Sequence, residues 1–323
     1  MALLEVNHLK TYFRTSKGMY KAVDDVSFDL NYGEALGLVG ESGCGKTTCA
    51  LSIARLLPKE GRICGGEILL EGKDLVGLSD DQIREKRWKD VSIVFQGAMN
   101  ALNPVMKVGD QIAEAIMLHD KVKKEEALRK AGELFELVEM PKGRISNYPH
   151  EFSGGMKQRA MIAMALACNP KIIIGDEPTT ALDVMVQAQI LNLLEKLRKE
   201  LNMGLILITH DLSILGETCD KIAVMYAGKI MEIGTVEEIF NNTAHPYTEK
   251  LIACFPNIGK EKVIPPSIEG IPPNMLEPPS GCSFHPRCHL AAELCRQKEP
   301  EHFRVNGNHF SACHKASEVM NER

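Results

Sequence analysis

The stretch that decides the fold is Gly40-Glu41-Ser42-Gly43-Cys44-Gly45-Lys46-Thr47, which fits the pattern G-x-x-x-x-G-K-[ST]. It follows the apolar run Ala35–Val39, which predicts a buried strand. Glycines at these positions let backbone N–H groups point at phosphate oxygens, and the following helix adds the positive end of its dipole. Lys46 is then expected to reach the β- and γ-phosphates, and the Thr47 hydroxyl to bind Mg²⁺. The stretch therefore predicts a loop that holds a nucleoside triphosphate.

The composition limits the compartment and the possible partners. A chain of 323 residues is long for one compact unit, so we expect one large domain with an appendage, and an apolar content of 44% supports a buried core. The formal net charge of −5 argues against a protein that wraps nucleic acid. No apolar run approaches the roughly 18 residues of a membrane span, and the N-terminus lacks a signal-peptide pattern. We therefore expect a cytosolic chain whose ten cysteines do not form a disulfide framework.

The pattern of elements along the chain predicts an α/β fold. Residues 1–95 predict short β segments around the phosphate loop, and apolar spacings of three and four predict helices between residues 108 and 140. Helix and strand patterns alternate over residues 158–209, which indicates a parallel sheet with crossover helices. Nine of the 16 prolines lie from Pro256 onward, so the tail is expected to be extended and irregular.

Two carboxylates follow a second apolar strand pattern, residues 171–175. Open parallel sheets bind their ligands at the carboxyl ends of strands, where Asp176 and Glu177 would lie. Asp176 is expected to hold the hydration shell of Mg²⁺. Glu177 is expected to act as the base that polarises the attacking water, because hydrolysis needs a base aimed in line with the γ-phosphate. A strand that simply ends in a solvated acidic turn is the alternative.

Gln96 and His210 also follow predicted strands, at residues 91–95 and 205–209. Both side chains are therefore expected at the same rim of the sheet, where each can touch the γ-phosphate or its water. Taken alone, such a histidine is more often structural and such a glutamine more often a surface residue.

A second glycine-containing segment, Phe152-Ser153-Gly154-Gly155-Met156-Lys157-Gln158-Arg159, opens a predicted helix. It offers another nest of backbone donors for phosphate. Because one chain needs one nucleotide cradle, the second suggests that two chains meet face to face. Each would then offer Ser153, Gly154 and Gly155 to ATP held on the other.

These motifs, with Ala181-Leu182-Asp183, resemble the ATP-binding cassette (ABC) family over residues 1–245 and come in that family's order. The resemblance implies a P-loop NTPase-type nucleotide-binding domain with a RecA-like core, a β subdomain and a helical subdomain over residues 97–157. It implies an ATPase that uses ATP and Mg²⁺, with Gln96, Glu177 and His210 as catalytic residues and Thr47, Gln96 and Asp176 around the metal. The implied nucleotide contacts are Phe13, Gly40, Glu41, Ser42, Gly43, Cys44, Gly45, Lys46, Thr47, Thr48, Gln96, Ser153, Gly154, Gly155, Asp176 and Asp183.

Two details of the resemblance are less regular. Phe13 falls where the family stacks an aromatic ring on adenine, but Tyr12 is its neighbour and core packing would also explain Phe13. The family's usual segment runs leucine-serine-glycine-glycine-glutamine, whereas Phe152 and Met156 occupy its ends here. This departure is expected to affect the hydrolysis rate at the partner's site rather than to remove that site.

Three stretches are similar to the oligopeptide and dipeptide importers within the family. They are residues 96–109, His245-Pro246-Tyr247-Thr248-Glu249-Lys250-Leu251 and Gly281-Cys282-Ser283-Phe284-His285-Pro286-Arg287-Cys288. The likeness then covers nearly the whole chain, as a nucleotide-binding domain over residues 1–245 and an extension over residues 246–323.

The similarity to these importers implies an ATPase subunit that drives uptake of di- or oligopeptides, bound peripherally at the cytoplasmic face of the membrane. Its implied partners are a second, different ATPase subunit, two transmembrane permease subunits and an extracytoplasmic solute-binding protein, and no nucleic acid. Residues 97–107 would face the permease. The same pattern serves nickel and some oligosaccharide systems, so the solute stays open. A soluble cassette ATPase acting on ribosomes or DNA is the rival, but such proteins usually carry two cassettes or a long coiled-coil insertion.

Four cysteines lie on the proline-rich extension: Cys282, Cys288, Cys295 and Cys313. The extension is expected to have little core of its own, so it needs a crosslink such as a structural metal site. Their uneven, long spacings favour an iron–sulfur cluster, and the extension that this one resembles carries a 4Fe-4S cluster in some members. Zinc is the competing metal, although its sites more often use close cysteine pairs. Free or oxidised cysteines are the third alternative. The histidines that could replace a ligand are His285, His289 and His314.

Overall fold

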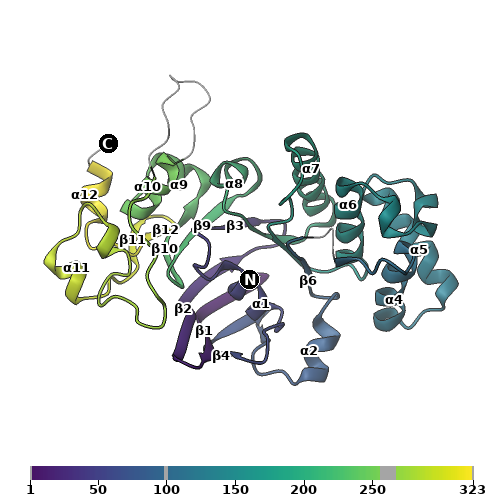
Figure 1. The fold of residues 1–323 in the computed structure, drawn as a ribbon, viewed down its shortest axis with the longest axis horizontal. Helices are drawn as coiled ribbons and strands as arrows, with labels where there is room; N and C mark the ends of the chain where they lie inside the picture. Colours follow the sequence, from purple (N-terminus) through teal and green to yellow (C-terminus); the bar gives the residue numbers. More distant parts are fainter. Residues whose placement is uncertain (1, 98–100, 255–266, 322–323) are drawn as a thin grey trace. The chain divides into compact units, whose positions relative to one another are not determined.

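The computed structural model (Figure 1) describes residues 2–97, 101–254 and 267–321. The chain forms two compact units. The first unit comprises Met1–Leu30, Ala35–Val76 and Thr209–Arg323, and the second comprises Asn31–Glu34 and Gly77–Ile208. Each unit has its own buried strands and its own helices. None of the described helices is long and apolar enough to span a membrane.

An antiparallel sheet of four strands lies in the first unit, in the order β2-β1-β4-β5. Its strands are β1 (Leu4–Thr15), β2 (Gly18–Leu30), β4 (Gly61–Leu70) and β5 (Lys73–Asp74). Along β1 the buried side chains are Leu4 and Val6, then Leu9 and Thr11, so the alternation changes phase between Val6 and Leu9. His8 has a positive φ of 51° there, and the pairing with β2 is irregular at the same place. A β-bulge therefore re-aims the second half of β1.

The phosphate loop of the first unit follows β3 (Ala35–Val39), in which every residue is buried. β3 pairs in parallel with β9 (Lys221–Tyr226), and the order continues through β10 (Lys229–Thr235), β12 (His309–Ser311) and β11 (Phe303–Asn306). Helices α1 (Lys46–Ile53), α8 (Leu212–Thr218), α9 (Val236–Asn241) and α10 (Pro246–Ala253) belong to the same unit.

The C-terminal extension is more regular than its prolines predict, which corrects the expectation of an irregular tail. Residues 267–284 contain no helix or strand, but a 3₁₀ turn (His285–Arg287), α11 (Glu293–Gln297), β11, β12 and α12 (Ala316–Asn321) follow. No proline follows Pro300, so the later backbone N–H groups can pair. β12 uses them to join the edge of β10, through pairs such as Glu232 with Ser311.

The second unit confirms the predicted alternation of helices and parallel strands. Its strands run in the order β8 (Gly204–Ile208), β7 (Ile172–Asp176) and β6 (Val91–Val94), and β7 is parallel to both neighbours. All residues of β7 and β8 are buried, as expected for a sheet covered on both faces. The helices are α2 (Asp80–Lys86), α4 (Val108–Asp120), α5 (Lys124–Leu137), α6 (Gly154–Ala165) and α7 (Val184–Leu201), with short 3₁₀ turns at Lys142–Ser146 and Pro149–Glu151.

Candidate nucleotide site

The phosphate loop has the backbone that its glycines permit. Gly40, Gly43 and Gly45 have positive φ values of 152°, 80° and 108°. A Cβ on Gly40 would clash with the carbonyl oxygen of Met225, and one on Gly45 with that of Ala22. Only glycine fits these two positions, because both the torsion and the space exclude a side chain. No side-chain hydrogen bond caps α1 at Gly45, and helix N-termini of this kind commonly bind anions in proteins.

Lys46 lies folded over this loop. Its Nζ donates to the carbonyl oxygens of Gly40 at 2.6 Å and Glu41 at 3.1 Å, and the side chain is buried. An ammonium has three donors on a flexible stem, so the same group can turn to phosphate oxygens when a nucleotide enters. Cys44 and Cys49 flank Lys46 and are buried, and burial raises the pKa of Cys49 to about 12. Both cysteines are thiols that pack the loop.

Phe13 and Tyr12 occupy different environments. A Cβ on Gly61 of β4 would lie 2.8 Å from Cε1 of Phe13, so the ring covers that glycine. Tyr12 donates its hydroxyl to Asp24 Oδ1 at 2.5 Å. Thr11, two residues before Phe13 on β1, bonds Ser52 of α1 at 2.8 Å.

Glu177 and Gln96 are brought together in the second unit. Gln96 Nε2 donates to Glu177 Oε2 at 2.8 Å, and Thr180 Oγ1 donates to the same oxygen at 3.0 Å. Glu177 has a positive φ of 47°, and its N–H donates to the carbonyl of Ile208 at 2.9 Å. A strained backbone held by its neighbours is typical of residues whose side chain must be aimed. The adjacent Asp176 is buried at the end of β7.

The predicted site residues divide between the two units. The first unit carries Phe13, the phosphate loop with Thr48, and His210; the second carries Gln96, Ser153, Gly154, Gly155, Asp176, Glu177 and Asp183. His210 is exposed and follows Thr209, whose N–H donates to Leu38 of β3 at 3.3 Å. This bond places His210 beside the strand that leads into the phosphate loop.

The serine–glycine segment is built as a helix start. Ser153 caps α6 by accepting the N–H of Met156 at 3.3 Å. A Cβ on Gly155 would lie 2.7 Å from Cγ1 of Val186, so a larger residue would push α6 from α7. Phe152 is buried and its ring lies 6.3 Å from that of Phe135. The phenylalanine at the departure from the family pattern is thus a core residue. Asp183 similarly caps α7, through Val186 N–H at 3.0 Å.

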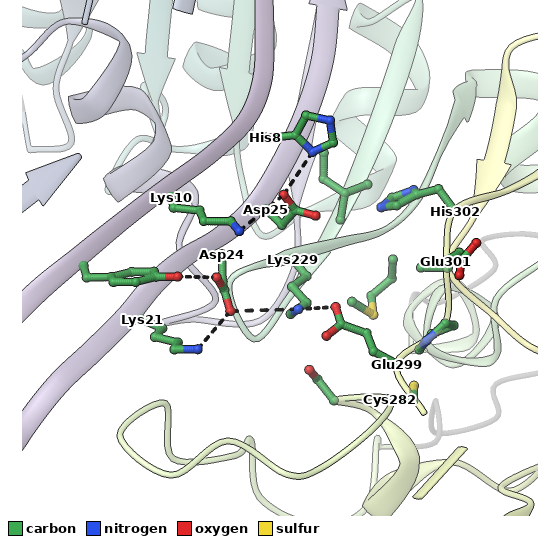
Figure 2. Close-up of a pocket in the computed structure, with 16 residues that line it drawn as sticks. His8, Lys10, Lys21, Asp24, Asp25, Lys229, Cys282, Glu299, Glu301 and His302 are labelled. Atoms are coloured by element: carbon green, nitrogen blue, oxygen red, sulfur yellow. Dashed lines mark hydrogen bonds and ion pairs between the residues drawn. The ribbon is translucent and has the colours of Figure 1, made fainter. Parts of the chain in front are cut away.

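A separate cavity of about 590 Å³ opens in the first unit among β1, β2, β10 and the extension (Figure 2). Asp24 bonds Tyr12 in it and faces Lys21 and Lys229 at 3.6 and 3.9 Å. Burial opposes ionisation of Asp24, but these three partners outweigh it and lower its pKa. The charges lining the cavity are largely paired with one another, as Lys229 with Glu299. No residue of the phosphate loop lines it.

The four cysteines of the extension line one small cavity of about 20 Å³, together with His245, His285 and His314. The described residues nevertheless contain no group of three or more His, Cys, Asp or Glu side chains arranged to hold a metal ion. Burial raises the pKa of Cys282 to about 11 and of Cys313 to about 12. Metal binding would require these thiols to lose their protons. The cysteines are gathered as predicted, but their arrangement is not that of a formed metal site.

Two residues in contact with the phosphate loop were not predicted as site residues. The Glu41 N–H donates to Tyr247 Oη, and Arg287 donates to the Glu41 carboxylate. Both lie in stretches that resemble the importers, but no spacing rule connects them to Glu41. Of the segment 97–107 that was expected to face a permease, residues 98–100 lie outside the described part of the chain.

Comparisons with known proteins agree with this geometry. Residues 23–180 match the family described as ABC transporter, and residues 231–295 match the family described as oligopeptide/dipeptide transporter, C-terminal region. The oligopeptide transport ATP-binding protein OppD of Bacillus subtilis is 48% identical over 95% of this chain and 87% of its own length. OppD of Escherichia coli is 45% identical over 99% of this chain and 95% of its own length. The probable peptide ABC transporter ATP-binding protein y4tR of Sinorhizobium fredii is 47% identical over 99% of this chain and 96% of its own length.

Solved structures give the same result for the fold. The dimeric ATP-binding cassette MJ0796, bound to ADP and Pi in a post-hydrolysis state, superposes with a TM-score of 0.65 at 26% identity, over 72% of this chain and 98% of its own. The cbiO1 subunit of a Clostridium perfringens ABC transporter complex superposes with a TM-score of 0.64 at 27% identity, over 75% and 92% of the two chains.

Proposed function

The chain belongs to the ABC transporter family, and on that premise we propose that it is the ATP-hydrolysing subunit of an importer of di- or oligopeptides. The observation that carries the proposal is the union, in one chain, of an ABC transporter match with a match to the C-terminal region of oligopeptide/dipeptide transporters. The two OppD relatives above, which are named for oligopeptide transport, extend over 95% and 99% of the chain. The match to the C-terminal region favours peptides over the nickel and oligosaccharide alternatives, and the soluble ATPase acting on ribosomes or DNA has no comparable support.

The hydrolytic roles follow from the geometry in each unit. Lys46 would leave the loop carbonyls and bind the β- and γ-phosphates, with the adenine against Phe13. Glu177 would act as the general base, and Gln96, which already bonds its carboxylate, would share the attacking water. Mg²⁺, held through Thr47, Gln96 and Asp176, would neutralise charge on the phosphates. His210 would contact the γ-phosphate from the first unit.

The proposed function also assigns the domains of the chain. We assign the nucleotide-binding domain to residues 1–245, with a helical subdomain over residues 97–157, and the extension to residues 246–323. Two ATPase subunits would pair so that Ser153, Gly154 and Gly155 of one contact the ATP held by the other, with Asp183 nearby. ATP would favour the closed pair because the closed state offers it contacts from both subunits, and hydrolysis would reopen it.

The pair would act on two permease subunits from the cytoplasmic face of the membrane, bound there peripherally. Residues 97–107 would face the permease, and a solute-binding protein outside the cell would deliver the peptide. The second ATPase subunit would be a different chain, as the resemblance to the importers implies. The departures at the buried Phe152 and at Met156 would make the two ATP sites of the pair unequal.

The extension would bind a 4Fe-4S cluster through Cys282, Cys288, Cys295 and Cys313, with zinc as the competing metal. The support is that all four thiols line one cavity, although their present arrangement is not a formed site. Iron and acid-labile sulfide analysis of anaerobically purified protein tests this. About four of each per chain, with a brown colour, supports the cluster; one colourless zinc per chain supports zinc; neither metal leaves free cysteines.

The import function is tested by purifying the chain from detergent-solubilised native membranes, identifying its partners by mass spectrometry and assaying ATP hydrolysis in the eluate. Two permeases and a second cassette subunit are expected. Reconstitution of that complex in vesicles should then give ATP-dependent uptake of a labelled di- or oligopeptide, and uptake of nickel or an oligosaccharide alone would change the solute. Recovery of ribosomal or DNA-bound proteins without any permease would overturn the transport assignment.

A further inference from the structure

The contact between the C-terminal extension and the phosphate loop centres on Arg287. Its side chain is only 4% exposed, and every one of its five N–H donors has an acceptor. Two go to the Glu41 carboxylate, from Nη1 at 2.6 Å and from Nη2 at 3.0 Å. The others go to Tyr226 Oη at 3.2 Å and to the carbonyl oxygens of Ile268 at 3.1 Å and Glu269 at 2.9 Å. A bidentate, fully satisfied guanidinium is a strongly oriented contact.

Glu41 is held at three points, and this fixes its place in the loop. Its carboxylate is bound by Arg287, its N–H donates to Tyr247 Oη at 3.0 Å, and its carbonyl accepts from Lys46 at 3.1 Å. Arg287 and Tyr247 belong to residues 246–323, far from the loop in sequence. The extension therefore binds the first turn of the phosphate loop through both the backbone N–H and the side chain of Glu41.

The segment that carries Arg287 is held by buried aromatic rings and by a bond to α10. The rings of Tyr226, Tyr247 and Phe284 are at most 1% exposed, and their centroids lie 4.7 to 5.3 Å apart. The carbonyl oxygen of Arg287 accepts from Lys250 Nζ of α10 at 2.9 Å. The segment that carries Arg287 is thus packed into the core on one side and bonded to α10 on the other. Moving Arg287 away from Glu41 would therefore disrupt these contacts as well.

We propose that Arg287 is a positioning residue for ATP binding, which holds Glu41 so that the phosphate loop keeps its anion-binding shape. It also balances the charge of the Glu41 carboxylate, which would otherwise stand uncompensated next to an incoming triphosphate. The proposal rests on nucleotide binding at this loop and goes beyond it, because it makes the extension a part of the ATP site. Arg287 touches no reacting group, so it acts on ATP affinity rather than on the chemical step.

The test compares Arg287→Gln, Glu41→Gln and the double variant, using ATP binding to the full-length chain and KM and kcat in the assembled importer. Arg287→Gln should weaken ATP binding and raise KM by about 10-fold, while kcat changes by less than about threefold. The double variant should bind ATP no more weakly than Arg287→Gln alone, because the unpaired carboxylate is gone. Arg287→Lys, which keeps the charge but not the fork, should fall between the wild type and Arg287→Gln.

Controls separate this proposal from folding and from the assignment of the site. Arg296→Gln alters an exposed arginine of the same extension and should leave KM unchanged. If Arg287→Gln does not fold, Glu41→Gln tests the contact from the loop side. An unchanged KM in folded Arg287→Gln, or additive losses in the double variant, would overturn the proposal. Lys46→Ala should abolish ATP binding, and if ATP still binds, the assignment of the nucleotide site is wrong. If Lys46→Ala loses ATP binding but Arg287→Gln binds ATP like the wild type, only the proposal for Arg287 is wrong.

Discussion

At the scale of single residues, the site depends on side chains whose neighbours already aim them. Gln96 and Thr180 both donate to Oε2 of Glu177, and its backbone is held in a left-handed conformation. Such an arrangement fixes the carboxylate before the substrate arrives, so that little reorganisation is left for the reaction. Lys46 is different, because in the proposed site it would exchange its bonds to the carbonyl oxygens of Gly40 and Glu41 for bonds to phosphate oxygens.

Glu177→Gln should separate binding from hydrolysis. The amide keeps the size of the side chain but cannot accept a proton, so the hydrolysis rate should fall by about 10²- to 10⁴-fold while ATP still binds. Single-turnover hydrolysis and nucleotide binding on the same sample measure both. Thr180→Ala, which removes one bond to the carboxylate, is the matched control and should lose far less. Turnover at the wild-type rate in Glu177→Gln would mean that another group is the base.

Two glycines of the phosphate loop should respond differently to alanine. Gly43 and Gly45 both have positive φ, which costs an alanine about 1–2 kcal/mol at either position. Only Gly45 also faces a backbone carbonyl, that of Ala22, whereas the space around Gly43 is open. Gly45→Ala should therefore lower the free energy of unfolding by a further ~1–3 kcal/mol. Urea unfolding of both variants checks this, and equal losses would contradict the steric argument.

At the scale of elements, short helices are placed by packing and caps rather than by their own propensity. Helix α1 has only eight residues, which is too short to be stable alone. It is held by contacts such as that between Ser52 and Thr11 of β1. Helix α6 likewise starts at the Ser153 cap and packs through Gly155 against α7. Changes in such contacts are expected to move the site residues at the helix starts.

Helix α10 has a cap that titrates. The buried His245 accepts the Tyr247 N–H through Nδ1 at 3.0 Å, which requires the neutral ring, and burial lowers its pKa to about 3. The unfolded chain binds this proton near pH 6.5, so the free energy of unfolding should fall as the pH drops from about 6.5 toward 3. The largest slope from one histidine is about 1.4 kcal/mol per pH unit.

His245→Asn tests that dependence, because asparagine caps helices without titrating. Urea unfolding between pH 7 and pH 4 should give a flatter profile than the wild type. His150→Asn changes an exposed histidine and should leave the profile as it is. A wild-type slope retained in His245→Asn would show that the acid sensitivity comes from other groups.

At the scale of the whole molecule, the proposal gives the chain two parts of a nucleotide cradle, which would act at different ATP sites of the proposed pair. ATP should therefore drive association of the two ATPase subunits. In the Glu177→Gln variant the ATP-bound pair should persist, as seen by gel filtration with light scattering in the presence of Mg²⁺ and ATP. Lys46→Ala, which cannot hold the phosphates, should stay unassociated under the same conditions. If Lys46→Ala associated to the same extent as Glu177→Gln, ATP binding would not be what holds the two subunits together.

Much of the fold and part of the site could be predicted from the sequence, because they depend on local patterns. The glycines of the phosphate loop require torsions that only glycine adopts readily, and the run Ala35–Val39 has the continuous apolar character of a buried parallel strand. Gln96 and Glu177 were expected at one rim because each follows such a strand, and they do meet.

The extension shows where local patterns stop being informative. Its prolines predicted an irregular segment and its cysteines a metal site, whereas β12 pairs with β10 and the cysteines gather without forming a metal-binding arrangement. Strand pairing at a sheet edge depends on the partner strand that the fold supplies, and no sequence spacing reports that.

The sequence by itself determined the phosphate loop, the buried strand before it and the two carboxylates at the end of β7, since torsion preference and apolar patterning act between near neighbours. Only the tertiary structure decided that Arg287 binds the carboxylate of Glu41, 246 residues away in sequence, and that the Glu41 N–H donates to Tyr247 Oη. The physical reason is that such a contact depends on the packing of Tyr226, Tyr247 and Phe284, whose joint burial exists only once the chain has folded.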